Sequence, residues 1–172
     1  MFITEIKIMS VNAHCSNACM HALLQSDDSH ILLIQEPWHY TVATLRSNTK
    51  PKGTPQKGLP SNNRWTAHLP RLRPNETTKV AIYTKKTLIE GENFRILHQH
   101  PLANRNSMVL DIIDDNNTTL HLVNVYHQVP DWGHDLHALL SANIDDLIPT
   151  AILGDFNTHS LRWSLPNKPE SS

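Results

Sequence analysis

Residues 151–163 read AILGDFNTHSLRW, an apolar run that ends abruptly on an acid, an amide and an imidazole. The segment from Ala151 to Gly154 has the composition of a buried strand, and Asp155 follows it at once. An aspartate at the end of an apolar strand is costly to bury unless a partner compensates its charge. This stretch therefore predicts a sheet whose strand ends carry polar side chains with a functional role.

Length and composition indicate one domain. The chain has 172 residues, 39% of them hydrophobic, which is enough for a single core. Glu5 and Lys7 interrupt the N-terminal apolar run, and no segment reaches the roughly 18 apolar residues of a membrane span. We therefore expect an intracellular chain, with the nucleus as one candidate location and no signal peptide or transmembrane segment. Residues 1–165 would form the domain and residues 166–172 a polar tail.

Residue spacing predicts a mixed α/β order of elements. A strand over residues 3–11 is followed by a helix capped at Ser16 and Asn17, and then by a strand from residue 31 that is buried on both faces. Residues 41–63 lack periodicity and are interpreted as a mobile loop. Antiparallel strands are predicted at residues 65–69, 79–85, 94–99, 107–113 and 118–126, followed by a helix over residues 136–147 and a strand over residues 151–154.

Two cysteines raise the question of a metal site. Cys15 and Cys19 are one helical turn apart and have His14 and His21 as neighbours. Because the chain has no second cysteine pair, we interpret them as small core-facing residues on the helix, with no disulfide implied.

Four strand ends deliver polar groups in chain order, namely Asn12, Glu36, Tyr126, and Asp155 with Asn157. Taken singly, each has an ordinary interpretation as a turn former, a surface acid or a half-buried aromatic. Together they are harder to dismiss, because Glu36 and Asp155 each end an apolar run and need compensation. Mg²⁺ prefers oxygen ligands and retains several waters, so Glu36, Asp155 and Asn12 would suit it, with Mn²⁺ as an alternative ion.

Charge is unevenly distributed along the chain. Residues 46–95 hold eleven Lys/Arg and three acids, a net charge of +8, whereas the remainder holds four and thirteen, a net charge of −9. A basic segment beside an acidic site would hold a polyanion over the carboxylates, although such a run is also typical of a solvated loop. The candidate nucleic-acid ligands are Lys50, Lys52, Lys57, Arg64, Arg71 and Arg73.

The ordered motifs VNAHCSN, LLIQEPW, LVNVY and ILGDFNTHSLRW resemble those of the endonuclease/exonuclease/phosphatase superfamily. QEPW and the extended GDFN motif look most like the endonuclease domain of non-long-terminal-repeat retrotransposons. The resemblance runs from Lys7 to Trp163. It implies a four-layer α/β sandwich of two mixed sheets flanked by helices, similar to deoxyribonuclease I, with a Mg²⁺-dependent phosphodiesterase site at one edge. It also implies DNA as substrate and a reverse transcriptase segment encoded downstream.

The same resemblance implies a role for each site residue. Glu36 corresponds to the metal-ligand glutamate and Asn12 to a neighbouring metal or phosphate ligand. Tyr126 corresponds to the phosphate-contacting tyrosine, Asp155 to the acid that orients the attacking water, and Asn157 to the amide that steadies the transition state. The residues matching the extended motif, for which we expect supporting or packing roles, are His159 and Trp163.

The superfamily's late Ser-Asp-His motif has no counterpart here. Of twelve histidines only His159 follows Asp155, and the later acid is Glu170 in the polar tail. We therefore expect a C-terminally truncated copy without its last strands, and weak or absent turnover. Two further hypotheses stay open. Within the superfamily, the chain could be a phosphatase or a nuclease for RNA tails. From a different functional class, it could be a non-catalytic nucleic-acid-binding remnant. A fragment that does not fold stably is the remaining alternative.

Overall fold

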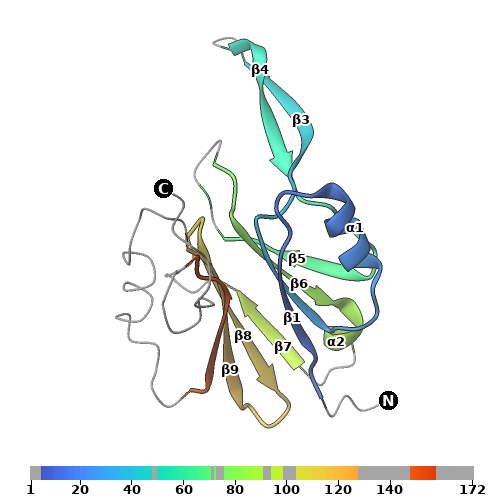
Figure 1. Ribbon diagram of the computed structural model, residues 1–172, viewed down its shortest axis with the longest axis vertical. Coiled ribbons are helices and arrows are strands. Elements are labelled where there is room, and N and C mark those ends of the chain that lie inside the picture. The colour runs from blue at the N-terminus through green and yellow to red at the C-terminus, as the bar shows by residue number, and fades with distance from the viewer. Residues whose placement is uncertain are drawn as a thin grey trace, which may run out of the picture.

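The computed structural model describes residues 5–47, 50–70, 72, 76–90, 94–98, 104–127 and 148–157. Two four-stranded sheets form the body of the molecule (Figure 1). The first has the order β1 (Ile8–Asn12), β2 (Ile31–Gln35), β6 (Val80–Lys85) and β5 (Trp65–His68). The second has the order β10 (Thr150–Asp155), β9 (Thr119–Tyr126), β8 (Ser107–Asp114) and β7 (Phe94–His98).

Each sheet contains one parallel pair of strands. β1 lies parallel to β2, and β10 lies parallel to β9, while the other neighbours in both sheets are antiparallel. In space, β1 and β2 contact β10, and β2 also contacts β9. The carboxyl ends of parallel strands meet at the same edge of a sheet, so the residues that end these four strands are brought to one edge of the sandwich.

The main core fills the space between the two sheets. The first sheet contributes Ile31, Leu33, Val80 and Ile82, and the second contributes Met108, Leu110, Ile112, Leu122 and Tyr126. These residues are between 0% and 9% exposed. Because β2 is buried on both faces, its other side chains, Leu32 and Ile34, belong to a second cluster on the outer face of the first sheet.

The helix α1 (Asn17–Gln25) covers that outer face with its buried residues Met20 and Leu24. Its N-cap is Ser16, whose hydroxyl accepts a hydrogen bond from the Cys19 N–H at 3.2 Å, as the sequence predicted. The interpretation of both cysteines as core-facing helical residues was wrong for Cys15. Cys15 is exposed and lies in the turn before the helix, whereas Cys19 packs partly against the cluster; both thiols are free.

A buried amide pair joins the two sheets. Gln35 Nε2 donates to Asn124 Oδ1 at 2.6 Å, and Asn124 Nδ2 donates to the carbonyl oxygens of Ile34 and Ala81 at 3.1 and 2.9 Å. Asn124 lies in β9 and is 0% exposed. Its two donated hydrogen bonds therefore connect it to the backbone of two strands in the opposite sheet. Hydrogen bonds are directional, whereas apolar contacts are not. These bonds therefore form in only one position of the first sheet relative to the second.

Gly154 allows β10 to approach β9 closely. A Cβ built on this glycine would lie 1.9 Å from the carbonyl oxygen of Val125, a distance that no side chain can adopt. The glycine of the GDFN motif is therefore required by the parallel pairing that places Asp155 beside Tyr126.

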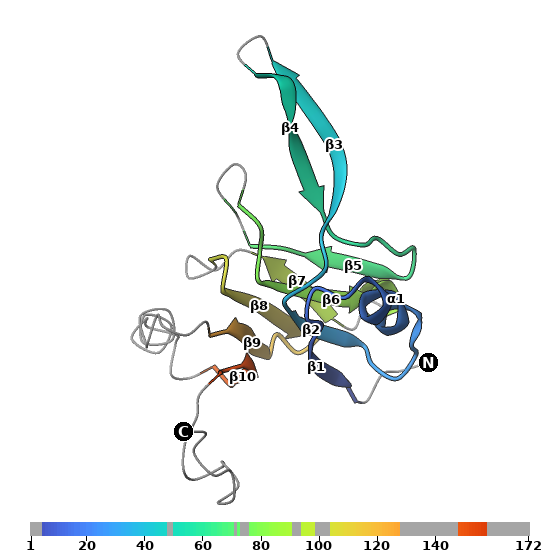
Figure 2. The same cartoon turned by 45° about the horizontal axis from the view of Figure 1, so that its top comes forward.

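Residues 41–63 were expected to form a loop, and this prediction was wrong for residues 41–47 and 50–58, while residues 59–63 lie outside any helix or strand. β3 (Tyr40–Ser47) and β4 (Lys50–Gly58) form an antiparallel hairpin, a separate sheet that projects from the two larger ones (Figure 2). Threonine and valine in TVATL favour a strand, while Pro51 and Pro55 are tolerated because a two-stranded sheet leaves each strand an unpaired edge.

The remaining strand predictions are confirmed within a residue or two, apart from the first, which begins at Ile8 and includes Asn12. The antiparallel run, however, is divided between the two sheets, with a short helix α2 (Lys86–Glu90) between β6 and β7. The helix expected at residues 136–147 lies outside the described residues. In the described ranges, no helix is both long and apolar enough to pass through a membrane.

The buried amide pair makes a prediction about stability. Replacing Asn124 by leucine removes three hydrogen bonds and should lower the free energy of unfolding by about 1–3 kcal/mol, measured by urea denaturation. The double variant Gln35→Leu/Asn124→Leu removes both polar partners and should lose less than the sum of the two single variants. Strictly additive losses would mean that the pair does not act as one unit.

Candidate active site at the shared sheet edge

The ends of β1, β2, β9 and β10 bring four polar side chains into two direct hydrogen bonds. Asn12 Nδ2 donates to Asp155 Oδ2 at 2.6 Å, joining β1 to β10. The Tyr126 hydroxyl donates to Glu36 Oε1 at 2.9 Å, joining the end of β2 to the end of β9. Residues as far apart in the sequence as 12 and 155 therefore meet at the edge where both sheets end.

The backbone around Glu36 is held in an uncommon conformation. Glu36 has a φ of 46°, and His14 and Cys15, in the turn after β1, have φ values of 47° and 54°. Such left-handed conformations cost non-glycine residues about 1–3 kcal/mol each when other contacts impose them. Here the Glu36 N–H donates to the Lys79 carbonyl at 2.9 Å, and the Glu36 carbonyl accepts from Cys15 N–H at 2.8 Å. These bonds fix the direction in which the Glu36 carboxylate leaves the sheet.

Glu36 is surrounded by donors and positive charge. Lys79 Nζ lies 3.4 Å from Oε1, and His14 Nδ1 lies 3.6 Å from Oε2. Burial alone would raise the pKa of Glu36, but the hydrogen bond from Tyr126 and the charge of Lys79 outweigh it. The pKa of Glu36 is thereby held below its ordinary value, and the side chain is ionised at neutral pH.

Tyr126 stays protonated at this edge. Burial and the hydrogen bond to Glu36 raise the pKa of its hydroxyl to about 12. Lys79 Nζ also lies 5.5 Å from the centroid of the Tyr126 ring, which is a cation–π distance. Tyr126 is therefore a hydrogen-bond donor at neutral pH and does not supply a phenolate.

Asp155 accepts hydrogen bonds on both carboxylate oxygens. Besides the bond from Asn12 to Oδ2, Oδ1 accepts the Asn157 N–H at 3.1 Å, which closes a tight turn in which Asn157 has a φ of 43°. Asn157 Nδ2 donates to the His127 carbonyl at 2.7 Å, so one hydrogen of this amide is directed to the backbone after β9. Asn12 Oδ1 accepts the His14 N–H at 2.8 Å. Each site side chain is thus oriented by at least one further contact.

The family model for the Endonuclease/Exonuclease/phosphatase family matches residues 9–171. The chain belongs to this family. Among solved structures, the "Endonuclease domain of TRAS1, a telomere-specific non-LTR retrotransposon" has a similar fold, with a TM-score of 0.62 and 16% sequence identity. The match covers 92% of this chain and 63% of that one, so this chain spans less than two thirds of that domain's length. No curated protein matches the chain. The expected fold of two mixed sheets is confirmed.

Enzymes of this family are generally metal-dependent, and the donor set at the edge fits a hard cation. Among the described residues, no three His, Cys, Asp or Glu side chains form a group that would hold a metal ion by themselves. Mg²⁺ does not need such a group, because it commonly binds one or two carboxylates and fills its other positions with water and phosphate oxygens. Glu36 Oε2 and Asn12 Oδ1 are hard oxygen donors of this kind, and they would hold the ion.

A depression of about 230 Å³ adjoins Glu36. Its wall consists of Cys15, Glu36, Pro37, Trp38, His39, Lys57, Thr77, Thr78 and Lys79. His39 Nε2 lies 2.9 Å from the Thr78 carbonyl oxygen, which joins the segment after β2 to the segment before β6. Burial lowers the pKa of His39, so its ring is largely neutral at pH 7.

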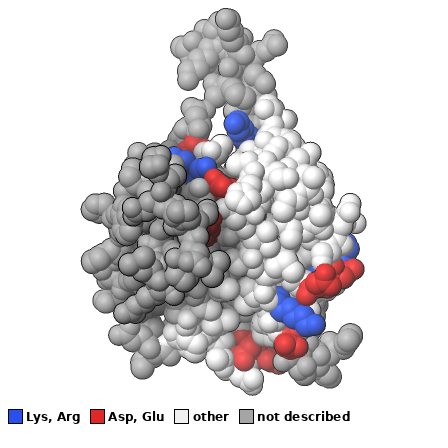
Figure 3. Space-filling model, viewed as in Figure 1, with Lys and Arg blue, Asp and Glu red and all other residues white. Residues whose placement is uncertain are grey.

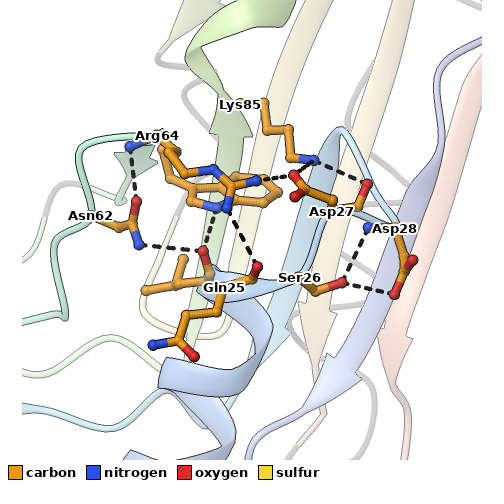
Figure 4. Close-up of polar contacts among 9 residues, drawn as sticks. Gln25, Ser26, Asp27, Asp28, Asn62, Arg64 and Lys85 are labelled. Carbon is orange, nitrogen blue, oxygen red and sulfur yellow. Dashed lines mark hydrogen bonds and ion pairs between the residues drawn. The ribbon is translucent and has the colours of Figure 1, made fainter.

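The structure separates the basic residues that the sequence grouped together. Lys57, near the end of β4, is exposed and lines the depression beside Glu36. Lys50 and Lys52 belong to the projecting part of β4. Arg64 lies at the other end of β6, a strand about 17 Å long, where it pairs with Asp27 (Figure 4). Arg71, Arg73, His159 and Trp163 lie outside the described residues.

On the face drawn in Figure 3, the described residues include charges of both signs. Figure 3 shows blue and red atoms side by side in small groups on a mostly uncharged face. Near Arg64, Asp27 Oδ1 also accepts a hydrogen bond from Lys85 Nζ at 3.1 Å, so one acid pairs with two cations there. Among the described residues, Lys57 and Lys79 are the lysines that line the depression beside the candidate site.

The sequence did not single out Lys79, His14 or Asn124. Lys79 was counted as part of a strand, yet it directly precedes β6, which runs antiparallel to β2. The start of β6 must then lie beside the end of β2, where Glu36 is located. A lysine directly before β6 could therefore have been predicted to lie near Glu36. His14 and Asn124 have no comparable signal, because their contacts depend on a turn geometry and on the packing of one sheet against the other.

Removing the Tyr126 hydroxyl should raise the pKa of Glu36. Since the pKa is lowered on folding, this carboxylate contributes stability that is fully present above its unfolded pKa and is lost as the pH falls through the folded pKa. Tyr126→Phe should shrink this pH-dependent contribution, and carboxyl-carbon NMR should show Glu36 protonating at higher pH. Tyr83→Phe, whose hydroxyl bonds the Pro60 carbonyl, is the matched control and should leave Glu36 unchanged. An unmoved Glu36 pKa in Tyr126→Phe would contradict the assigned contact.

Proposed function

We propose that this chain is a Mg²⁺-dependent phosphodiesterase that nicks DNA, as an endonuclease of the non-long-terminal-repeat retrotransposon type. The observation that carries the proposal is the hydrogen-bonded edge, where Glu36, Tyr126, Asn12 and Asp155 from four strands of two sheets come together. Membership of the family supports a nuclease-type hydrolase. The similarity in fold to the endonuclease domain of a non-LTR retrotransposon supports the retrotransposon type.

In this proposal Glu36 and Asn12 hold the cation, and Tyr126 donates a hydrogen bond to a phosphate oxygen. Asp155 orients the attacking water, since its two oxygens are already fixed by Asn12 and by the Asn157 N–H. Asn157 steadies the charge that develops on the phosphorus oxygens with the amide hydrogen that does not bond His127. When bound, Mg²⁺ supplies Lewis-acid polarisation of the phosphate and neutralises its charge.

Lysines place the DNA backbone over these acids. Lys57 and Lys79 are the cations nearest to Glu36 in the depression. We propose the same nucleic-acid-binding role for Lys50, Lys52, Arg64, Arg71 and Arg73, and supporting roles for His159 and Trp163. In a complete element, a reverse transcriptase segment would be the functional partner of this domain.

These 172 residues contain no Ser-Asp-His motif after Asn157, and in the family that histidine acts at the phosphate. Catalytic groups that act as a unit fail together when one is missing. We therefore propose that a preparation of these 172 residues binds Mg²⁺ and DNA but turns over slowly.

The test is nicking of supercoiled plasmid with and without Mg²⁺. Slow nicking that requires Mg²⁺ is expected, with a further loss of at least about tenfold in Glu36→Gln, because a neutral amide oxygen is a weaker ligand for Mg²⁺ than a charged carboxylate. Asp111→Asn, an acid on β8 that contacts His121, is the matched control and should nick like the parent chain.

Two outcomes would contradict this function. Nicking that persists in EDTA, or that is as fast in Glu36→Gln as in the parent chain, would show that cleavage does not depend on a metal ion at Glu36. DNA binding that falls steeply with salt, together with no Mg²⁺-dependent cleavage at any enzyme concentration, would instead identify a non-catalytic nucleic-acid-binding protein.

A further inference from the structure

The depression beside Glu36 is lined by basic side chains that a metal site does not require. Among the described residues that line it, Lys57 and Lys79 are cations and Glu36 is an acid. The described lining therefore holds two lysines and one acid, with Asp155 lying further along the same edge. A wall that held metal alone would be expected to carry excess negative charge. A surplus of positive charge beside a cation site favours an anionic ligand that enters next to the metal.

Lys79 is held where it can contact both the carboxylate and an incoming anion. Its Nζ lies 3.4 Å from Glu36 Oε1, a long contact, and the side chain remains 25% exposed. A lysine has three ammonium donors, so one contact of this length leaves capacity for phosphate oxygens. Lys57, from β4, faces the same depression from the base of the hairpin.

The wall of the depression also contains an aromatic side chain. Trp38 lines the depression and stacks on Tyr40, with ring centroids 5.6 Å apart and an interplanar angle of 20°. Trp38 also packs against the apolar cluster beneath α1, so the ring is supported from behind. A supported aromatic ring next to basic side chains is the usual arrangement for binding a nucleobase together with its phosphate.

We propose that this depression is a nucleotide subsite, which takes the nucleotide next to the scissile phosphate with its base against Trp38 and its phosphate between Lys57 and Lys79. The volume of about 230 Å³ is below the roughly 300–1,000 Å³ of pockets that enclose a whole small ligand. It suits one nucleotide of a longer strand held from an open side. The choice of ligand rests on the proposed function, since a phosphodiesterase must bind the residues that flank the bond it cleaves.

Thymidine 3′,5′-bisphosphate is the probe, added in EDTA so that metal binding at Glu36 does not contribute. The readout is the indole N–H signal of Trp38 in ¹⁵N NMR, assigned by comparison with Trp38→Phe. The bisphosphate is expected to shift this signal and to bind more tightly than inorganic phosphate or thymidine alone. Lys57→Gln/Lys79→Gln should weaken binding by at least about tenfold, because both phosphate contacts are lost.

The matched control is Lys7→Gln/Arg95→Gln, which removes the same charge from two exposed residues outside the depression. It should bind the bisphosphate as the parent chain does. If both double variants weakened bisphosphate binding equally, the loss would be explained by net charge alone, and the subsite would be overturned. Binding of the bisphosphate no tighter than inorganic phosphate, or without any shift of the Trp38 signal, would overturn it as well.

The two proposals fail in different ways. A chain that binds the bisphosphate at Trp38 but shows no Mg²⁺-dependent nicking would overturn the phosphodiesterase function and support the subsite. A chain that nicks plasmid with Mg²⁺ while its Trp38 signal stays unmoved would support the function and overturn the subsite.

Discussion

The hydrogen bond between Gln35 and Asn124 is the contact on which the arrangement of the site depends. Most of the space between the sheets is filled by aliphatic side chains, which would pack in more than one register. The amide pair and its bonds to Ile34 and Ala81 fit a single register. Gln35 directly precedes Glu36, and Asn124 lies two residues before Tyr126. The register that satisfies the buried amides is therefore the one that brings the Tyr126 hydroxyl to Glu36.

The charged groups at the edge follow from the same geometry. Two carboxylates that end apolar strands would destabilise the fold if they lacked partners. Asp155 is matched by the amide of Asn12 and the N–H of Asn157, while Glu36 is matched by Tyr126, Lys79 and His14. Tyr126 and Lys79 lower the pKa of Glu36 and so keep it ionised, which is the state that a hard cation requires. Stability and the proposed binding of metal thus depend on the same contacts.

Much of the fold was predictable, because alternation and capping are local signals. The cap at Ser16, the doubly buried β2 and the strand before Asp155 all follow from adjacent residues. The division of the antiparallel strands between two sheets does not, since pairing with distant strands is decided by packing. The β3–β4 hairpin was missed because its prolines and glycine resemble those of a loop. Of the site, the strand-end positions of Asn12, Glu36, Tyr126 and Asp155 were predictable, whereas Lys79 and the amide pair became evident only when the strands were paired.

We propose that the ends of β1, β2, β9 and β10 form one cation site. Titration with Mn²⁺, a paramagnetic substitute for Mg²⁺, tests it directly through the broadening of backbone amide NMR signals. The account predicts that Asn12, Glu36, Tyr126 and Asp155 broaden first and together, and that excess Mg²⁺ restores them. Broadening that begins instead at Asp27 and Asp28, or at the Asp114–Asp115 turn, would contradict it, because those acids lie outside the shared sheet edge.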